Sequence, residues 1–290
     1  MQHIDCIIKL DNSDNGQPVW IDSQQSLFWV DHKNQKLYQY NTETREITDC
    51  KLDAPILSLS PSINHGFIAT LEDGIGFYDM QKRQVTYISK PEPFANNKQT
   101  IAGIVDKYGD YWSFTQQKKP TEKQGNLYQL SPKMGMQRII GDGWDCTAPP
   151  AFSNDGSILY QSSGTTRYIY ATQLNDQRQP IATSNFCRIS KQDGYPHGLC
   201  VDSEDCLWVC HRSAGYISRY NQEGECIEKI RIEAPGVKYC AFGGTHLDTL
   251  FIVTSGQEDL TRTRRKIYFS DAILSYKTTV AGLQPYQFIG

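Results

Sequence analysis

The sequence predicts an all-β fold, a six-bladed β-propeller. Short runs rich in β-branched and aromatic residues recur from end to end, and Gly, Asn, Asp and Pro separate them. The 3.6-residue spacing of an amphipathic helix is hard to find. The runs repeat with a period of roughly 40 to 48 residues, the length of one four-stranded propeller blade. Six such repeats fit the 290 residues, and we expect them to form a single domain over residues 1–290.

The strands are predicted in order along the chain. Residues 27–31 read Leu-Phe-Trp-Val-Asp, and a polar turn separates them from a second run over residues 36–41. Turn residues on both sides of an aromatic, β-branched run are typical of a strand. The same order returns in the runs 207–210, 215–221 and 226–230. Weaker copies pair the runs 66–69 and 76–79, 111–114 and 125–130, 158–161 and 168–171, and 249–253 and 272–276.

The two ends of the chain are predicted to close the ring. Each blade buries its faces only against its neighbours, so an open ring would leave unpaired edges. Residues 5–9 and 285–289 are both strand-like and are the expected partners in one shared blade.

Composition excludes several classes of protein. The formal net charge is −3, with 29 Lys and Arg against 32 Asp and Glu, so a general nucleic-acid binder is not expected. No run approaches the roughly 18 apolar residues of a membrane helix, and the first residues lack a secretory signal. We therefore expect a soluble cytoplasmic protein without a membrane or nucleic-acid partner. The nine Cys residues show no Cys-x-x-Cys spacing, and we expect reduced, structural thiols.

Several motifs then carry a family resemblance. They occupy residues 16–20, 103–106, 195–202, 207–209, 241–255 and 282–286. In order and spacing they resemble the family of senescence marker protein (regucalcin), gluconolactonases and luciferin-regenerating enzyme. The resemblance implies a six-bladed propeller that hydrolyses sugar lactones with one divalent cation, often Ca²⁺ or Zn²⁺, held at the mouth of the channel.

The chain departs from the family pattern at each position that the resemblance assigns to the cation. Gln17 stands in place of a Glu, Ala148 in place of an Asn, and His197 of Pro196-His197-Gly198 in place of an Asp that also acts as base. Gln99 and Ile101 fall in the segment that replaces the substrate-contacting Arg-x-Asn-Asp pattern.

These departures argue against a bound cation. Ca²⁺ takes six to eight oxygens with carboxylates among them, and both acidic ligands are gone. Zn²⁺ accepts imidazole but requires three or four ligands. We expect no cofactor, and if a metal is present, Gln17 and His197 would hold it.

What remains is a neutral, hydrogen-bonding pocket. His197 has an unperturbed pKa of about 6.5 and is the candidate acid or base, although it would equally fill a polar turn by hydrogen bonding. Gln17 and Ala148 are candidate substrate contacts, together with Gln99 and Ile101.

Three further residues are candidates for the same pocket. Trp144 offers an aromatic face to a sugar ring, and Asp145 a carboxylate that could orient the imidazole. The alternatives are that Trp144 packs between blades and that Asp145 caps a turn. His211 comes directly after the predicted strand of residues 207–210 and could approach the top of the channel.

Three functions fit this pattern. The first is hydrolysis of a small sugar-acid lactone or related cyclic sugar, which would lack the oxyanion stabilisation that a cation supplies. The second is metal-independent isomerisation of a sugar acid. The third is a catalytically inactive propeller that binds a small ligand or a protein, since fold alone does not choose among them.

Overall fold

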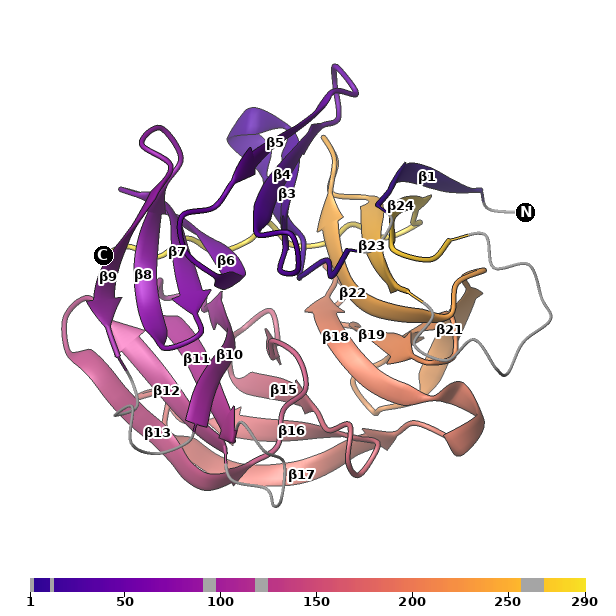
Figure 1. Ribbon diagram of the computed structural model, residues 1–290. Helices are drawn as coiled ribbons and strands as arrows, with labels where there is room; N and C mark the ends of the chain where they lie inside the picture. The colour runs from indigo at the N-terminus through magenta and orange to yellow at the C-terminus, as the bar shows by residue number, and fades with distance from the viewer. Residues whose placement is uncertain (1–2, 11–12, 91–97, 118–124, 257–268) are drawn as a thin grey trace.

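The computed structural model describes residues 3–10, 13–90, 98–117, 125–256 and 269–290 of the chain. They form six antiparallel sheets of four strands each, arranged as blades around a central channel (Figure 1), which confirms the predicted six-bladed propeller. Two short 3₁₀ turns, η1 (Asp22–Gln24) and η3 (Lys191–Asp193), are the helices of this part of the chain. Within the same residues no helix has the length and apolar character needed to span a membrane.

Each blade begins with the strand that lies beside the channel. The first blade contains β2 (Val19–Ile21), β3 (Ser26–Asp31), β4 (Lys36–Asn41) and β5 (Ile47–Lys51). The second contains β6 (Ile56–Ser62), β7 (Gly66–Leu71), β8 (Gly74–Asp79) and β9 (Gln84–Ser89). The third contains β10 (Lys98–Val105), β11 (Tyr111–Gln117), β12 (Gly125–Ser131) and β13 (Gly135–Trp144).

The remaining three blades repeat this order. The fourth contains β14 (Ala151–Phe152), β15 (Ile158–Ser162), β16 (Tyr168–Leu174) and β17 (Pro180–Arg188). The fifth contains β18 (Tyr195–Val201), β19 (Leu207–Arg212), β20 (Tyr216–Tyr220) and β21 (Cys226–Arg231). The sixth contains β22 (Gly236–Gly243), β23 (Thr249–Ser255), β24 (Ala272–Lys277) and, from the other end of the chain, β1 (Ile4–Lys9).

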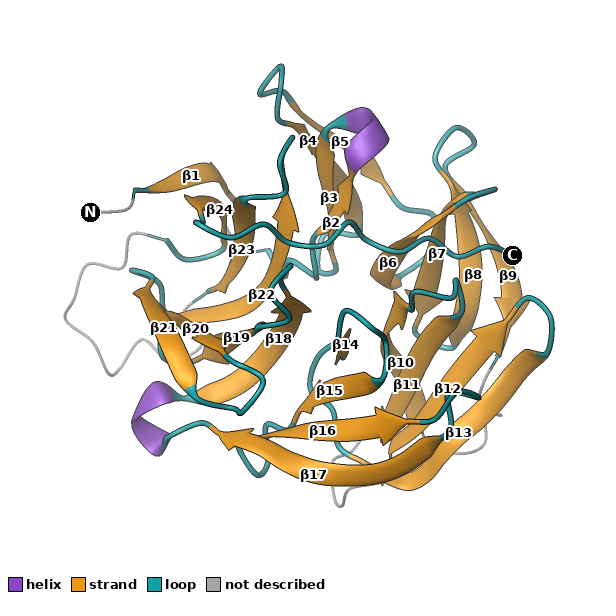
Figure 2. Cartoon of the chain, turned by 180° about the vertical axis from the view of Figure 1, so that it is seen from behind, coloured by secondary structure: helices purple, strands orange, loops and turns teal. Residues whose placement is uncertain are grey.

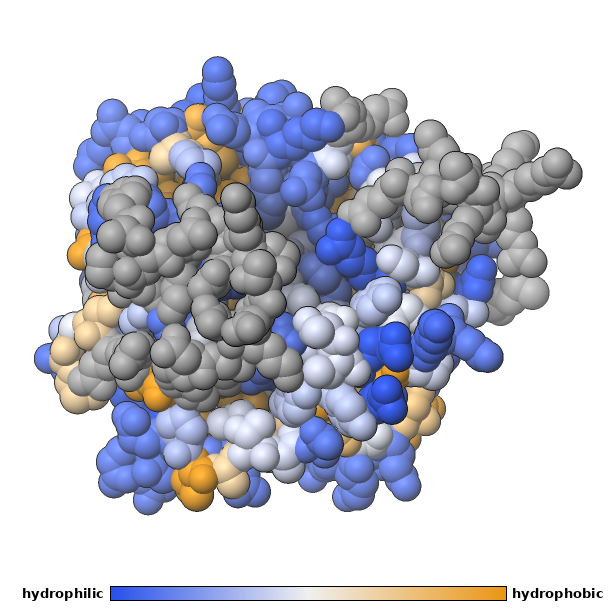
Figure 3. All heavy atoms as spheres, turned by 60° about the horizontal axis from the view of Figure 1, so that its bottom comes forward, coloured by the Kyte–Doolittle hydropathy of each residue, from blue (hydrophilic) through white to orange (hydrophobic). Residues whose placement is uncertain are grey.

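Burial follows the position of a strand in its blade. Every residue of β3 is buried, whereas no residue of the outermost strand β9 is. Hydrophilic residues predominate on the face in Figure 3, and hydrophobic ones form small separate groups. The hydrophobic core therefore lies between blades and not on their outer edges.

Aromatic pairs join neighbouring blades. The rings of Phe28 and Phe67 meet edge-on at 5.3 Å, across the contact between the first and second blades. Trp208 and Phe242 meet in the same way at 5.8 Å between the fifth and sixth. Such pairs add to the free energy gained by burying the rings themselves.

The third and fifth blades each have an aspartate-containing turn directly after their inner strand. Trp112 Nε1 donates to Asp106 Oδ2 at 2.7 Å, and Trp208 Nε1 donates to Asp202 Oδ2 at 2.7 Å. In both turns the other carboxylate oxygen accepts two backbone N–H groups. The sequence repeat of these two blades therefore corresponds to the same set of hydrogen bonds. These bonds fix the turn to the strand that follows it.

The ring is closed by one chain end and crossed by the other. Strand β1 pairs with β24, so the N-terminal part of the predicted closure is confirmed. The C-terminal part is wrong, because residues 278–290 form no strand of that sheet. They cross the end of the channel instead (Figure 2), where Phe288 N donates to Pro61 O at 2.9 Å. This tail ties the sixth blade to the second.

Candidate functional site

A cavity of about 580 Å³, which we call the cup, lies at the end of the channel away from the tail. All six blades, or the turns that lead into them, contribute to its lining. The side chains that matter below are Asn15, Gln17, Gln99, His197, Arg212 and Lys238. Their convergence makes the cup the candidate site, since ligand sites are concave and hold a few converging polar groups.

His197 lies in the wall of the cup with one ring nitrogen fixed. Its Nδ1 lies 2.9 Å from the carbonyl oxygen of Lys238, so that nitrogen donates and Nε2 keeps its lone pair. The ring is 6% exposed and meets the Tyr239 ring edge-on at 4.9 Å. Burial, with the charge of Lys238 second, lowers the pKa of His197 to about 3. The imidazole is therefore neutral at pH 7 and is a hydrogen-bond acceptor, not the titrating group that an unperturbed pKa implied.

Two buried side-chain oxygens in the cup have no hydrogen-bond partner in the described part of the chain. They are Gln17 Oε1 and Asn15 Oδ1. Asn15 is 2% exposed, and its amide nitrogen donates to Ser13 Oγ at 2.9 Å. A buried acceptor without a donor is costly, so both oxygens suit a ligand that brings O–H or N–H groups.

The segment before β2 is held by a close approach. Gly16 N donates to Val30 O at 2.8 Å, and a Cβ on Gly16 would lie 2.6 Å from His32 Nε2. The absence of a side chain at residue 16 lets the His32 ring pack there, with its Nε2 2.8 Å from Leu57 O. Gln17 is thereby placed at the rim of the first blade.

An ion-pair network fills one side of the cup. Asp14 pairs with Lys238, and its Oδ2 lies 3.6 Å from His32 Nδ1. Its interaction with His32, and then the charge of Lys238, holds the pKa of Asp14 well below its usual range. Asp14 is thus ionised and interacts with both Lys238 and His32.

Positive charge is in excess around His197. Arg212 also lines the cup, and its charge adds to that of Lys238 in lowering the pKa of His197. Among the charged residues of the cup, Lys33, Arg212 and Lys238 outnumber Asp14 and Asp271. The charged residues that line the cup therefore carry one more positive than negative charge, where the resemblance places a cation.

The residues present do not fit the family's divalent cation. The described residues hold no group of three His, Cys, Asp or Glu that could bind a metal ion. The unpartnered oxygens of Asn15 and Gln17 come from neutral amides, and Asp14 is engaged with Lys238. Ca²⁺ needs six to eight oxygens with carboxylates among them, so the cup lacks both the number and the charge of ligands.

Four residues predicted from the sequence line the cup. They are Gln17, Gln99, Ile101 and His197. The structure brings them together from β10, β18 and the segment before β2, which lie far apart in the chain.

Three predicted residues are not brought to the cup. Ala148 is fully buried, and the neighbouring Pro149 lines the cavity in its place. Asp145 Oδ2 accepts from Ser163 Oγ at 2.5 Å, which supports the turn-capping alternative. His211 is 1% exposed, with Nδ1 2.9 Å from Asp193 O, and burial lowers its pKa. Trp144 ends β13, but its side chain lies outside the described residues.

Asn15, Arg212 and Lys238 are among the cup residues that the sequence did not single out. Asn15 lies two residues before Gln17, and this proximity was the available signal. Lys238 is 41 residues from His197, and only the contact between β18 and β22 joins them.

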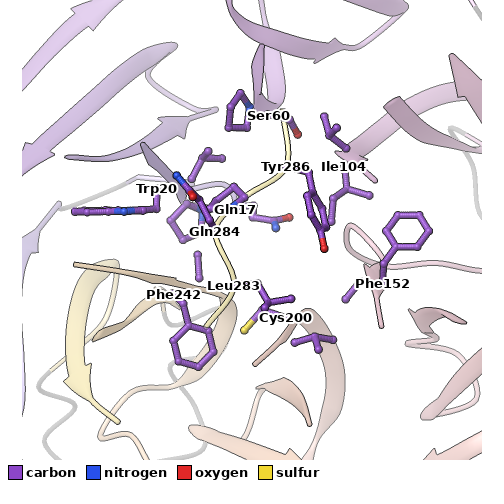
Figure 4. A pocket seen from close by; sticks show the side chains of 18 of the residues that line it. Gln17, Trp20, Ser60, Ile104, Phe152, Cys200, Phe242, Leu283, Gln284 and Tyr286 are labelled. Carbon is purple, nitrogen blue, oxygen red and sulfur yellow. The ribbon is translucent and has the colours of Figure 1, made fainter. Parts of the chain in front are cut away.

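Below the cup the channel becomes apolar (Figure 4). This inner pocket, of about 140 Å³, is lined by the inner strands and by residues 283–286 of the tail. Trp20, Phe152 and Phe242 surround it, and Gln17 lines both it and the cup. The inner pocket is thus more apolar than the cup.

Known proteins share this architecture. Regucalcin from Danio rerio is 24% identical, over 99% of this chain and 98% of its own. A 6-deoxy-6-sulfogluconolactonase from Pseudomonas putida is 22% identical over 98% of both chains. The crystal structure of a calcium-binding regucalcin from Agrobacterium tumefaciens, 16% identical, superposes with a TM-score of 0.88 over 99% of this chain and 97% of that one. The family model described as the SMP-30/Gluconolactonase/LRE-like region matches residues 16–256, and the chain belongs to this family.

Proposed function

We propose that this chain hydrolyses a small sugar-acid lactone, or a related cyclic sugar derivative, in the cup and without a bound cation. The observation that carries the proposal is the pair of buried, unpartnered oxygens of Asn15 and Gln17. Sugar hydroxyls are the donors that would satisfy them. A relative that covers nearly the same length is named a sulfogluconolactonase, which is a lactone hydrolase.

The chemistry follows from the neutral imidazole. With Nδ1 donating to Lys238 O, the Nε2 lone pair accepts a hydrogen bond from a water molecule and orients it toward the lactone carbonyl. A group with a pKa of about 3 is a weak base, so this role is orientation and not full proton removal.

As water adds, the carbonyl oxygen gains negative charge; the ring C–O bond then breaks, and the proton that the water loses passes through solvent to the departing ring oxygen. Lys238 and Arg212 place positive charge close to His197, in the part of the cup where that charge develops. Fixed positive charge in a partly dehydrated site stabilises an oxyanion. The same charges favour a lactone that carries an acidic substituent.

The test is hydrolysis of a panel of sugar lactones, followed by acid release in weak buffer. We expect His197→Leu to lower kcat/KM by about 10²-fold, because the water loses its acceptor, and Gln17→Leu to raise KM. His3→Leu is the matched control, since His3 is exposed and pairs with Asp5 at the surface. A rate equal to that of the uncatalysed reaction with every lactone would overturn the proposal and leave the ligand-binding alternative.

The isomerase alternative loses its main support in the structure. Isomerisation of a sugar acid needs a base that takes and returns a proton near neutral pH. Burial and Lys238 hold the pKa of His197 at about 3, which is too low for that role at pH 7. The cytoplasmic location stays a prediction.

A further inference from the structure

Three thiols meet where the fifth and sixth blades face each other. Cys200 Sγ and Cys240 Sγ lie 3.4 Å apart, on β18 and β22. The thiol of Cys210, on β19, also hydrogen-bonds to Cys240. All nine cysteines are free thiols. The role proposed for the cup uses none of the three.

The two inner strands approach closely at this point. A Cβ on Gly198 would lie 2.6 Å from Lys238 O and 2.8 Å from Tyr239 Cα, so glycine permits the contact. A disulfide has an S–S distance of about 2.05 Å, so the two sulfurs, 3.4 Å apart, must come closer by about 1.3 Å for the bond to form. The backbone already holds the two sulfurs in position.

Both thiols are reached from the channel. Cys200 and Cys240 line the inner pocket, and Figure 4 shows the Cys200 side chain in its wall. Cys210 is fully buried and lines neither the cup nor the inner pocket. The pocket of about 140 Å³ admits molecules the size of water or hydrogen peroxide.

We propose that Cys200 and Cys240 are an oxidisable pair, which hydrogen peroxide converts to a disulfide that joins the inner strands of the fifth and sixth blades. Cys240 is the attacking sulfur. Hydrogen bonds from the thiols of Cys200 and Cys210 lower the pKa of Cys240, whereas burial raises that of Cys200. A thiolate is the reactive form of cysteine.

The reaction balances with peroxide as the only oxidant. The Cys240 thiolate attacks one peroxide oxygen, the O–O bond breaks, and the departing hydroxide takes a proton to become water. Cys240 is then a sulfenic acid. The Cys200 sulfur attacks it, the S–O bond breaks, and the thiol proton leaves with the hydroxide as a second water. Two thiols have lost two electrons and two protons to one peroxide.

The disulfide would form next to the cup. Cys200 lies three residues after His197 on β18, and Cys240 lies two residues after Lys238 on β22. The hydrogen bond from His197 Nδ1 to Lys238 O spans the same two strands. Oxidation therefore locks the strand pair that positions the imidazole, and the proposal does not depend on which ligand the cup takes.

Peptide mapping of the folded protein tests the proposal. After dilute peroxide, blocking of free thiols and trypsin digestion, we expect residues 192–212 crosslinked to residues 239–262, lighter by two hydrogen atoms and released by dithiothreitol. Residues 192–212 contain Cys200, Cys206 and Cys210, so fragmentation of the crosslinked peptide identifies the bonded sulfur. This step needs no variant and is unaffected by one that fails to fold.

Single variants assign the roles. The crosslink should be lost in Cys200→Ala and in Cys240→Ala, and it should form in Cys210→Ala. Cys226→Ala is the matched control, because Cys226 is exposed and lies outside the cluster. A bond from Cys240 to Cys210, oxidation of Cys240 to sulfinic or sulfonic acid without a crosslink, or no change at either thiol would overturn the proposal.

Discussion

The cup and the inner pocket are two halves of one channel, and the same strands line both. Gln99, Ile101 and Ala102 of β10 line the cup, and the next three residues line the inner pocket. Strands β18 and β22 change in the same way, from His197 and Lys238 to their apolar continuations.

Each of these strands therefore has one half that stabilises the fold and another half that lines the ligand site. The inner halves pack against each other and against the tail, so substitutions there should act on the free energy of unfolding. The outer halves carry buried polar atoms without partners, so substitutions there should act on ligands and on protonation. The predictions below test this division in order of expected effect.

The largest effect is expected at the inner end, for Asp202→Ala. Asp202 is fully buried and accepts from Trp208 Nε1 and Arg219 Nε, both at 2.7 Å. Removing its carboxylate takes the buried partner from Arg219 and leaves the Trp208 and backbone donors unpaired, and we expect a loss of about 3–5 kcal/mol in the free energy of unfolding. Urea denaturation measures it. Glu204→Ala is the control, since exposed Glu204 binds the same Arg219 and should change stability by less than about 1 kcal/mol.

The tail supplies the next effect. Phe288 is 3% exposed and packs in a cluster with Ile68, Ile75 and Tyr111. Phe288→Ala should destabilise the protein by about 3 kcal/mol, because it empties a core position. Exposed Ile289→Ala should change thermal stability little. Equal losses of stability in the two variants would contradict the packing of Phe288 in this cluster.

A pH dependence should come from His197. Its pKa is about 3 in the folded protein and about 6.5 when unfolded, so the unfolded chain binds the proton first as pH falls. Stability should fall by about 1.4 kcal/mol per pH unit from about pH 6.5 toward pH 3 on account of this group. His197→Gln should remove that part of the slope. An unchanged slope in the variant would show that the imidazole is not buried as described.

The smallest effect is a gain. The double variant Gln17→Glu, His197→Asp returns two carboxylates to the family's positions, which favours a hard cation. We expect calcium to raise the stability of this variant by about 1.4 kcal/mol at tenfold excess over its Kd, and to leave the parent unchanged. Thermal melting with and without calcium measures both. Stabilisation of the parent by calcium would contradict the charge argument.

The sequence predicted more of the fold than of the site. Alternating aromatic and β-branched runs determine strands locally, so all six blades were predictable. The tail was not, because residues 285–289 have a strand's composition but are held by bonds to loops of other blades, such as Ile289 N to Gly109 O. The extent of the single domain stays a prediction.

For the site, motif position was enough to find Gln17 and His197. The pKa of His197 was not predictable, because it depends on burial and on Lys238, which is distant in the chain. Ala148 was predicted to contact the substrate, but the neighbouring Pro149 lines the cup instead. A sequence pattern does not determine the alignment at a turn to within one residue.

The central claim is that an uncharged amide pair and a neutral imidazole have replaced a cation cage. The most direct measurement is the rate of sugar-lactone hydrolysis after exhaustive chelation, with and without added Ca²⁺ or Zn²⁺. We predict the same rate in every case, with that rate lowered about 10²-fold in His197→Leu. A rate that disappears on chelation and returns with either ion would contradict the account.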